Sequence, residues 1–230
     1  MPLIVLWDID HTLIENSGVS KEIYAAAFTA LAGQLSREPA VTEGRTDRLI
    51  MAEMFRRHGL SVPPWEQVAR ALEEAGAGRE DDLRRRGRAL PGTREVLKAL
   101  AGVNWAVSSV LTGNIAANAL VKLRAFDLNI LLDLTVGAYG ADSEDRAGLV
   151  AVARQRIGAA YGLASDTPVV LVGDTPRDVE AALATGSKVV AVATGVNGAQ
   201  ELREAGAEVV LPDLCDTAGL ISQLRSWATG

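Results

Sequence analysis

Two kinds of hydrophobic pattern divide the chain. Residues 3–7 (Leu-Ile-Val-Leu-Trp) are a continuous apolar run of strand length, which is typical of a parallel strand buried on both faces. From about residue 16 to residue 87, apolar residues recur at helical spacing instead. Beyond Pro91, short apolar runs alternate with helical stretches. The pattern therefore predicts one strand, then a helical segment, then alternating strands and helices.

The breaks in these patterns set the expected elements. One helix is expected over 20–35, with Ser20 as its N-cap, and a second over 46–58, ended by Gly59. A third helical region is expected over 65–88, where Gly76 and Gly78 favour two shorter helices. Strands are expected over 106–111, 134–136, 169–172, 189–192 and 209–211. Strands that alternate with helices form right-handed βαβ units on a parallel sheet, and the first strand has to join this sheet to be buried.

The predicted fold class is therefore α/β, with two domains. Residues 1–15 and 88–230 form a Rossmann-like core in which helices flank a parallel sheet. Residues 16–87 form a small, all-helical domain inserted after the first strand.

Polar residues follow three of the predicted strands directly. Asp8 and Asp10 come after the first strand, Thr112-Gly113-Asn114 after another, and Asp174 and Asp178 after a third. Ligands bind at the carboxyl ends of strands in open α/β sheets, and two carboxylates at such a place repel each other unless a cation lies between them. The alternative is that these residues only turn the chain and cap helices.

These motifs, in this order, resemble those of the haloacid dehalogenase-like (HAD) hydrolase superfamily. The resemblance is to its phosphatases with a helical cap near the N-terminus, such as the phosphoglycolate phosphatase group, and it spans most of the chain. It implies a Mg²⁺-dependent phosphatase with Asp8 as the nucleophile, which forms an aspartyl-phosphate, and Asp10 as the general acid and base. The family's dehalogenases lack an acid at the position of Asp10, so its presence favours phosphoryl transfer.

The resemblance also implies a set of metal ligands. Asp8, the main-chain carbonyl of Asp10 and Asp174 would bind Mg²⁺, which prefers hard oxygen ligands. Thr12 matches a residue whose hydroxyl orders the loop. Asp178 is expected either to order metal-bound water or to lie in the first turn of a capped helix, and it can do both.

Phosphate binding is expected from Thr112 and the amide of Gly113. The family's lysine, usually in a Lys-Pro pair, has no counterpart of that form here, because the chain has no Lys-Pro. Arg146 is the preferred substitute, since it lies in the first turn of the helix after the strand expected at 134–136. Lys122 is the reserve, because about eight residues of helix would place it about 12 Å from the loop at Asn114.

The helical insertion resembles the cap that closes over the active site in this family. Arg45, in Gly44-Arg45-Thr46, is a candidate substrate contact, and an exposed arginine at a helix start is the alternative. His11 is a second candidate, at a position where many relatives have glycine; the alternative is a solvent-facing loop histidine.

Two other functions stay open. A phosphomutase of the same fold would return the phosphate to another hydroxyl, and a non-catalytic module would bind a metabolite without turnover. Phosphonate cleavage needs a cap lysine, and Lys21, the only lysine in the insertion, lies outside any recognised motif.

Composition limits the classes of partner and the cellular compartment that we expect. The net charge of −6 and the pI near 5.1 argue against a general nucleic-acid binder, and Arg84-Arg85-Arg86 follows three acids with which it can pair on a solvated helix. The single cysteine, Cys215, fits a reducing compartment, and we expect a cytoplasmic protein without a signal peptide or membrane span. The expected partner is a small phosphorylated metabolite, and the expected state is a monomer or a weak homodimer.

Overall fold

The centre of the molecule is a five-stranded parallel sheet with the strand order β4-β1-β5-β6-β7. The computed structural model describes residues 2–229. The strands of the sheet are β1 (Leu3–Trp7), β4 (Ala106–Val110), β5 (Val169–Gly173), β6 (Lys188–Val192) and β7 (Val209–Leu211). The apolar run at the N-terminus thus pairs with a strand on each side, as its burial on both faces requires.

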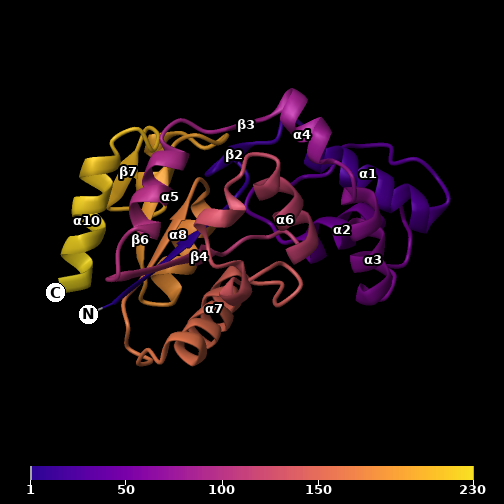
Figure 1. Ribbon diagram of the computed structural model, residues 1–230. Helices are drawn as coiled ribbons and strands as arrows, with labels where there is room; N and C mark the ends of the chain where they lie inside the picture. Colours follow the sequence, from indigo (N-terminus) through magenta and orange to yellow (C-terminus); the bar gives the residue numbers. More distant parts are fainter. Residues whose placement is uncertain (1, 230) are drawn as a thin grey trace.

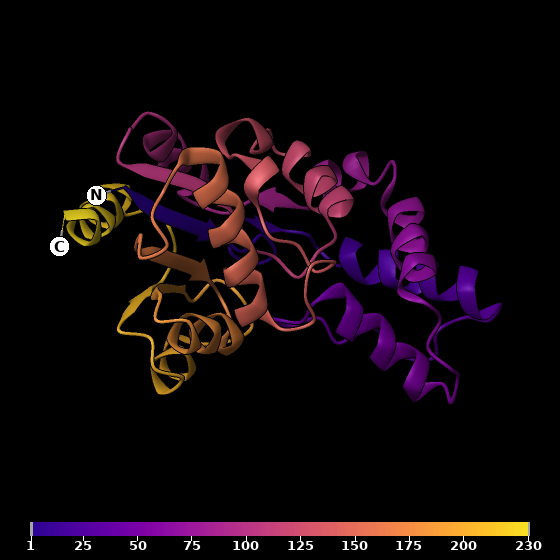
Figure 2. The same cartoon turned by 90° about the horizontal axis from the view of Figure 1, so that it is seen from below.

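Helices cover both faces of this sheet (Figures 1 and 2). Alternate residues of β1 divide between two apolar cores: Val5 and Trp7 pack in one, Ile4 and Leu6 in the other. The first core is completed by α5 (Thr93–Ala101) and α10 (Thr217–Thr229), and the second by α7 (Arg146–Tyr161), α8 (Pro176–Ala184) and α9 (Ala199–Glu204). The predicted α/β class with a parallel sheet between helices is confirmed.

Between β1 and β4 the chain leaves the sheet and forms a helical segment (Figure 1). Its helices are α1 (Val19–Ala32), α2 (Asp47–Arg57), α3 (Trp65–Gly76) and α4 (Glu80–Arg86). They share a core of their own, which includes Phe28, Met51 and Leu72 and continues onto α6 (Ala116–Arg124) of the sheet domain. Where the chain leaves and returns, β2 (Ile14–Glu15) pairs antiparallel with β3 (Arg88–Ala89). That residues 16–87 form a separate domain stays a prediction.

Two sequence-based expectations were wrong. Residues Leu134–Val136 are a 3₁₀ turn rather than a strand, because Asp133 Oδ1 accepts hydrogen bonds from both the N–H and the hydroxyl of Thr135. Ser20 does not cap the first helix, which begins one residue earlier after Gly18, whose φ is +84°. Within residues 2–229, no helix has the length and apolarity to span a membrane.

Candidate active site

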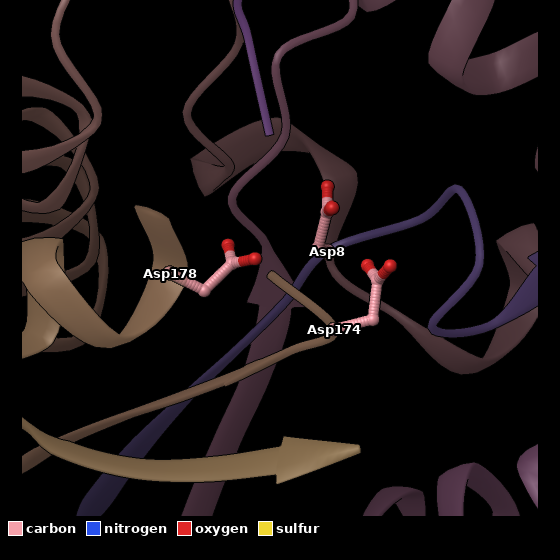
Figure 3. A group of neighbouring side chains, drawn as sticks. All are labelled: Asp8, Asp174 and Asp178. Atoms are coloured by element: carbon pink, nitrogen blue, oxygen red, sulfur yellow. The ribbon is translucent and has the colours of Figure 1, made fainter. Parts of the chain in front are cut away.

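The loops that leave β1, β4 and β5 meet at one edge of the sheet. Because β1 lies between the other two strands, Asp8 and Asp174 come from neighbouring strand ends. Figure 3 shows their side chains next to each other with both carboxylates extending to the same side, and Asp178 of α8 beside them. One oxygen from each of the three buried carboxylates lies within 4.8 Å of the others. The sequence motifs therefore converge in space as the resemblance implies.

Arg146 is the cation of this cluster. It is the first residue of α7, and its side chain is 6% exposed. Its Nη2 lies 3.2 Å from Asp8 Oδ2 and also donates to Asp178 Oδ1. The guanidinium therefore contacts two of the three carboxylates. That Arg146 takes the place of the family's lysine and binds phosphate stays a prediction.

Carboxylates crowded together in this way hold protons more tightly than free ones. Burial raises the pKa of Asp8 to about 6, and the Arg146 guanidinium only partly offsets this effect. Burial, followed by the charges of Asp8 and Asp178, raises the pKa of Asp174 well above its usual value. One cation for three carboxylates leaves a deficit of positive charge, and their oxygens are the ligands that Mg²⁺ prefers. The residues present thus fit a divalent cation.

Asp178 and Thr12 make hydrogen bonds that fix the positions of Arg146 and Asp174. Asp178 Oδ2 accepts hydrogen bonds from the N–H and the hydroxyl of Thr175, which closes a capping box at the start of α8. Its other oxygen binds Arg146, so the same side chain caps a helix and orients the cation. The hydroxyl of Thr12 donates to Asp174 Oδ1 at 3.1 Å, which links the first loop to the third.

The carboxylate of Asp10 has partners of its own. Its Oδ2 accepts from Lys122 Nζ at 2.6 Å and from Asn114 Nδ2 at 2.9 Å, and its Oδ1 accepts from Asn16 Nδ2 at 2.7 Å. Burial would raise the pKa of Asp10, but the Lys122 ammonium and the amide donors outweigh it and lower the pKa to about 2. The two aspartates of the first motif therefore lie in opposite electrostatic environments.

Lys122 lies closer to the loop of Thr112 and Asn114 than the sequence argument allowed. Its helix begins at Ala116 rather than near Asn114, and helical side chains lean toward the N-terminus of their helix. As a result its ammonium reaches Asn114 Oδ1 at 2.6 Å. Asn114, for which capping of that helix was the alternative, donates a hydrogen bond from its Nδ2 to Thr112 Oγ1 at 2.7 Å, and the residue directly before the helix is Ile115.

The helical segment closes over this edge of the sheet. A Cβ at position 113 would overlap the backbone carbonyl of Arg45, so Gly113 allows the two loops to touch. A cavity lies between them, and the space in it that is open to the centres of water molecules is about 40 Å³, enough for a few waters. Both candidate substrate contacts line it. His11 does so from a left-handed backbone with a φ of +60°, and its Nδ1 lies 3.1 Å from Glu15 Oε2. Substrate contact by His11 and Arg45 stays a prediction.

Asp47 is a residue that sequence reasoning missed. It is buried at the start of α2, where its carboxylate accepts from the Tyr24 hydroxyl at 2.6 Å and from the N–H of Ile115 at 2.8 Å. Burial raises the pKa of Asp47 to about 6 despite these donors. An acid in a first helical turn is common, and only its place directly after Gly44-Arg45-Thr46 could have drawn attention to it.

Comparisons with known proteins agree with the motifs. Residues 146–217, which carry Arg146, Asp174 and Asp178, match the family model described as HAD-hydrolase-like. No curated protein matches the chain significantly.

Solved structures share the fold over nearly the whole chain. A hydrolase from Pseudomonas syringae has a TM-score of 0.66 and 22% identity, over 96% of this chain and 98% of that one. A protein described as a β-phosphoglucomutase from Bacteroides vulgatus has a TM-score of 0.69 and 20% identity, over 100% and 91%. One described as a phosphoglycolate phosphatase from Haemophilus somnus has a TM-score of 0.65 and 17% identity, over 96% and 98%. The resemblance to HAD-like hydrolases is confirmed.

Proposed function

With the sequence signature and the fold of a HAD-like hydrolase as the premise, we propose that this protein is a Mg²⁺-dependent phosphatase of small phosphorylated metabolites. The observation that carries the proposal is the convergence of Asp8, Asp174 and Asp178 at the carboxyl end of the sheet, with Arg146 beside Asp8. A nucleophilic carboxylate, a place for a cation and a fixed guanidinium are what phosphoryl transfer to an aspartate needs.

The reaction has two steps. In the first, a carboxylate oxygen of Asp8 forms a bond to phosphorus while the bond to the ester oxygen breaks, and Asp10 gives a proton to the departing alcohol. Because the pKa of Asp10 is about 2 in the site without substrate, Asp10 has to take up this proton as the anionic ester binds, since a nearby negative charge favours the protonated acid. In the second, Asp10 takes a proton from water, whose oxygen attacks the aspartyl-phosphate, and inorganic phosphate leaves Asp8 free again. Each step restores what the other consumes, so the enzyme is unchanged after one turnover.

The remaining site residues bind and orient the phosphoryl group. Arg146 would grip two phosphoryl oxygens, and Thr112 and the amide of Gly113 would bind another. Asp8, the main-chain carbonyl of Asp10 and Asp174 would hold the Mg²⁺, with Asp178 supporting them. The ion, when bound, would neutralise charge on the carboxylates and on the phosphoryl oxygens.

The helical segment, residues 16–87, acts as the cap in this proposal. Residues of the segment, among them Tyr24, Glu43 and Arg45, line the cavity beside Asp8, so a movement of the segment would change the access of a substrate to Asp8. Arg45 and His11, which line the cavity, are the proposed contacts with the non-phosphate part. We place the enzyme in the cytoplasm, in keeping with its single, exposed cysteine.

A phosphomutase is the second candidate, because proteins described as β-phosphoglucomutases are among the structures with this fold. Such an enzyme would pass the phosphoryl group from Asp8 to another hydroxyl rather than to water. A need for a bisphosphate activator would distinguish it from the phosphatase.

The test is phosphate release from a panel of small phosphate esters with Mg²⁺. We expect turnover of some esters by the wild type and none by Asp8→Asn or in EDTA. Turnover that persists in Asp8→Asn would rule out the aspartyl-phosphate. Metal binding without turnover of any ester would instead favour the mutase, or a binding module.

A further inference from the structure

Two buried cations lie in the site, and they face different carboxylates. Arg146 contacts Asp8 and Asp178, whereas Lys122 Nζ is 2.6 Å from Asp10 Oδ2. Lys122 is 2% exposed and approaches from α6. Among the interactions of residues 2–229, none joins Lys122 to Asp8. The two cations therefore have separate tasks.

Lys122, Asn114 and Asp10 form a closed polar unit. Lys122 Nζ donates to both side chains, at 2.6 Å each, and Asn114 Nδ2 donates to the same Asp10 oxygen at 2.9 Å. Asn114 Nδ2 also binds Thr112 Oγ1 at 2.7 Å, which ties the unit to the loop of Thr112. Because Lys122 and Asn114 are buried, their donors cannot turn to water when Asp10 moves, so the unit favours a single orientation of its carboxyl group.

We propose that Lys122 is a positioning residue for Asp10: it holds the Asp10 carboxyl in place for proton transfer at the ester oxygen, and it does not bind the phosphoryl group. The inference rests on the proposed function, since the proton has a destination only if an ester is cleaved. In that step the bond from phosphorus to the ester oxygen breaks, and the proton that Asp10 has taken up on substrate binding passes to this oxygen.

The test compares two esters that differ in their need for this proton. An alkyl phosphate releases a strongly basic oxygen that must be protonated, whereas p-nitrophenolate is a weak base and departs without help. The value of kcat/KM reports the steps up to departure of the leaving group. We expect Lys122→Met to lower kcat/KM for the alkyl phosphate by about 10²-fold, the cost of a misplaced catalytic group, and to change it little for p-nitrophenyl phosphate. Arg124→Met, an exposed change two residues along the same helix, is the matched control.

A second comparison separates positioning from phosphate binding. In an Asp10→Asn background, Lys122→Met should cause no further loss with the alkyl phosphate, because a residue that acts through Asp10 has nothing left to position. A phosphate-binding cation would still matter in that background. Lys122→Gln, which keeps an N–H donor without the charge, takes the place of Lys122→Met under the same criteria if the methionine variant does not fold.

Equal losses with the two esters, or a further loss in the Asp10→Asn background, would overturn the inference and leave the phosphatase proposal intact. A wild-type protein that cleaves no ester would overturn both.

Discussion

The hydroxyl of Tyr24 donates a hydrogen bond of 2.6 Å to Oδ1 of Asp47, and both side chains are buried. The other carboxylate oxygen accepts the N–H of Ile115, just ahead of α6, and the backbone N–H of Asp47 donates to the carbonyl of Gly113 at 2.8 Å. One carboxylate thus joins α1 and α2 of the helical segment to the loop that carries Thr112 and Gly113.

Asp47→Ala is therefore expected to weaken both folding and catalysis. It leaves the Tyr24 hydroxyl and the Ile115 N–H without their acceptor, which costs about 1–3 kcal/mol of unfolding free energy for a buried group. Urea unfolding measures the first effect, and kcat/KM measures the second. Tyr24→Phe is the matched control with a smaller effect, because Ile115 keeps its acceptor. Stability and kcat/KM equal to wild type would show that the contact does not hold the segment in place.

The pH dependence of stability gives a second test of Asp47. Its pKa is about 6 in the folded chain against an ordinary 3.8, so the folded state binds more protons than the unfolded state between these values. The stability that Asp47 contributes is therefore full below about pH 4 and is lost as the pH rises through about 6, by up to about 3 kcal/mol.

Urea unfolding in EDTA at several pH values, wild type against Asp47→Asn, measures this contribution as a difference. Asp8 titrates in the same window in both proteins, and Asp10, with a pKa of about 2, titrates below it. The stability advantage of wild type over the variant should fall between pH 4 and pH 6. An advantage that grows with pH would contradict the assigned direction of the pKa shift.

Arg146→Met should lower kcat/KM by about 10²–10³-fold, the range seen when one fixed donor to a developing charge is removed. The variant also leaves Asp8 and Asp178 facing each other without their cation. Arg146→Lys keeps the charge but loses the planar guanidinium that can bind two phosphoryl oxygens at once, so it should recover part of the activity. Gln155→Met, an exposed change on the same helix, serves as the control. Full activity in Arg146→Met would exclude Arg146 from phosphate binding.

Gly113→Ala should lower kcat/KM by more than about tenfold. The added methyl group overlaps the Arg45 carbonyl, so it holds the two loops apart and displaces the groups that they carry. Gly102→Ala, where the nearest heavy atoms lie 3.7 Å from the added carbon, is the control and should leave kcat/KM unchanged. A Gly113→Ala enzyme with wild-type kinetics would mean that catalysis does not require the closed arrangement.

The sheet and its carboxylates could be predicted because both follow from local pattern. Continuous apolar runs define the strands, and the topology of parallel sheets brings the residues that follow them, such as Asp8 and Asp174, to one edge. The strand expected at 134–136 was wrong because it too was predicted from local pattern alone. Three apolar or β-branched residues occur in strands and in turns alike. There the side chain of Asp133 decided the structure.

The partners of Asp10 could not be predicted in this way. Lys122 is 112 positions from Asp10 in the chain, and its reach depends on the direction of a helical side chain and on where α6 begins. Asp47 meets Ile115 only because the helical segment packs on α6. Contacts of this kind depend on the packing of whole elements, which local periodicity does not encode.

The pairing of β2 with β3 brings together the two places where the chain passes between the sheet domain and the helical segment. Ile14 lies opposite Ala89 and Glu15 opposite Arg88, so the chain leaves the sheet domain and re-enters it through adjacent residues. An insertion joined in this manner can be lengthened, replaced or recombined without breaking the sheet that carries Asp8 and Asp174. In the proposed function, selection can thus alter the substrate contacts of the segment while the sheet that positions Asp8 and Asp174 is inherited unchanged.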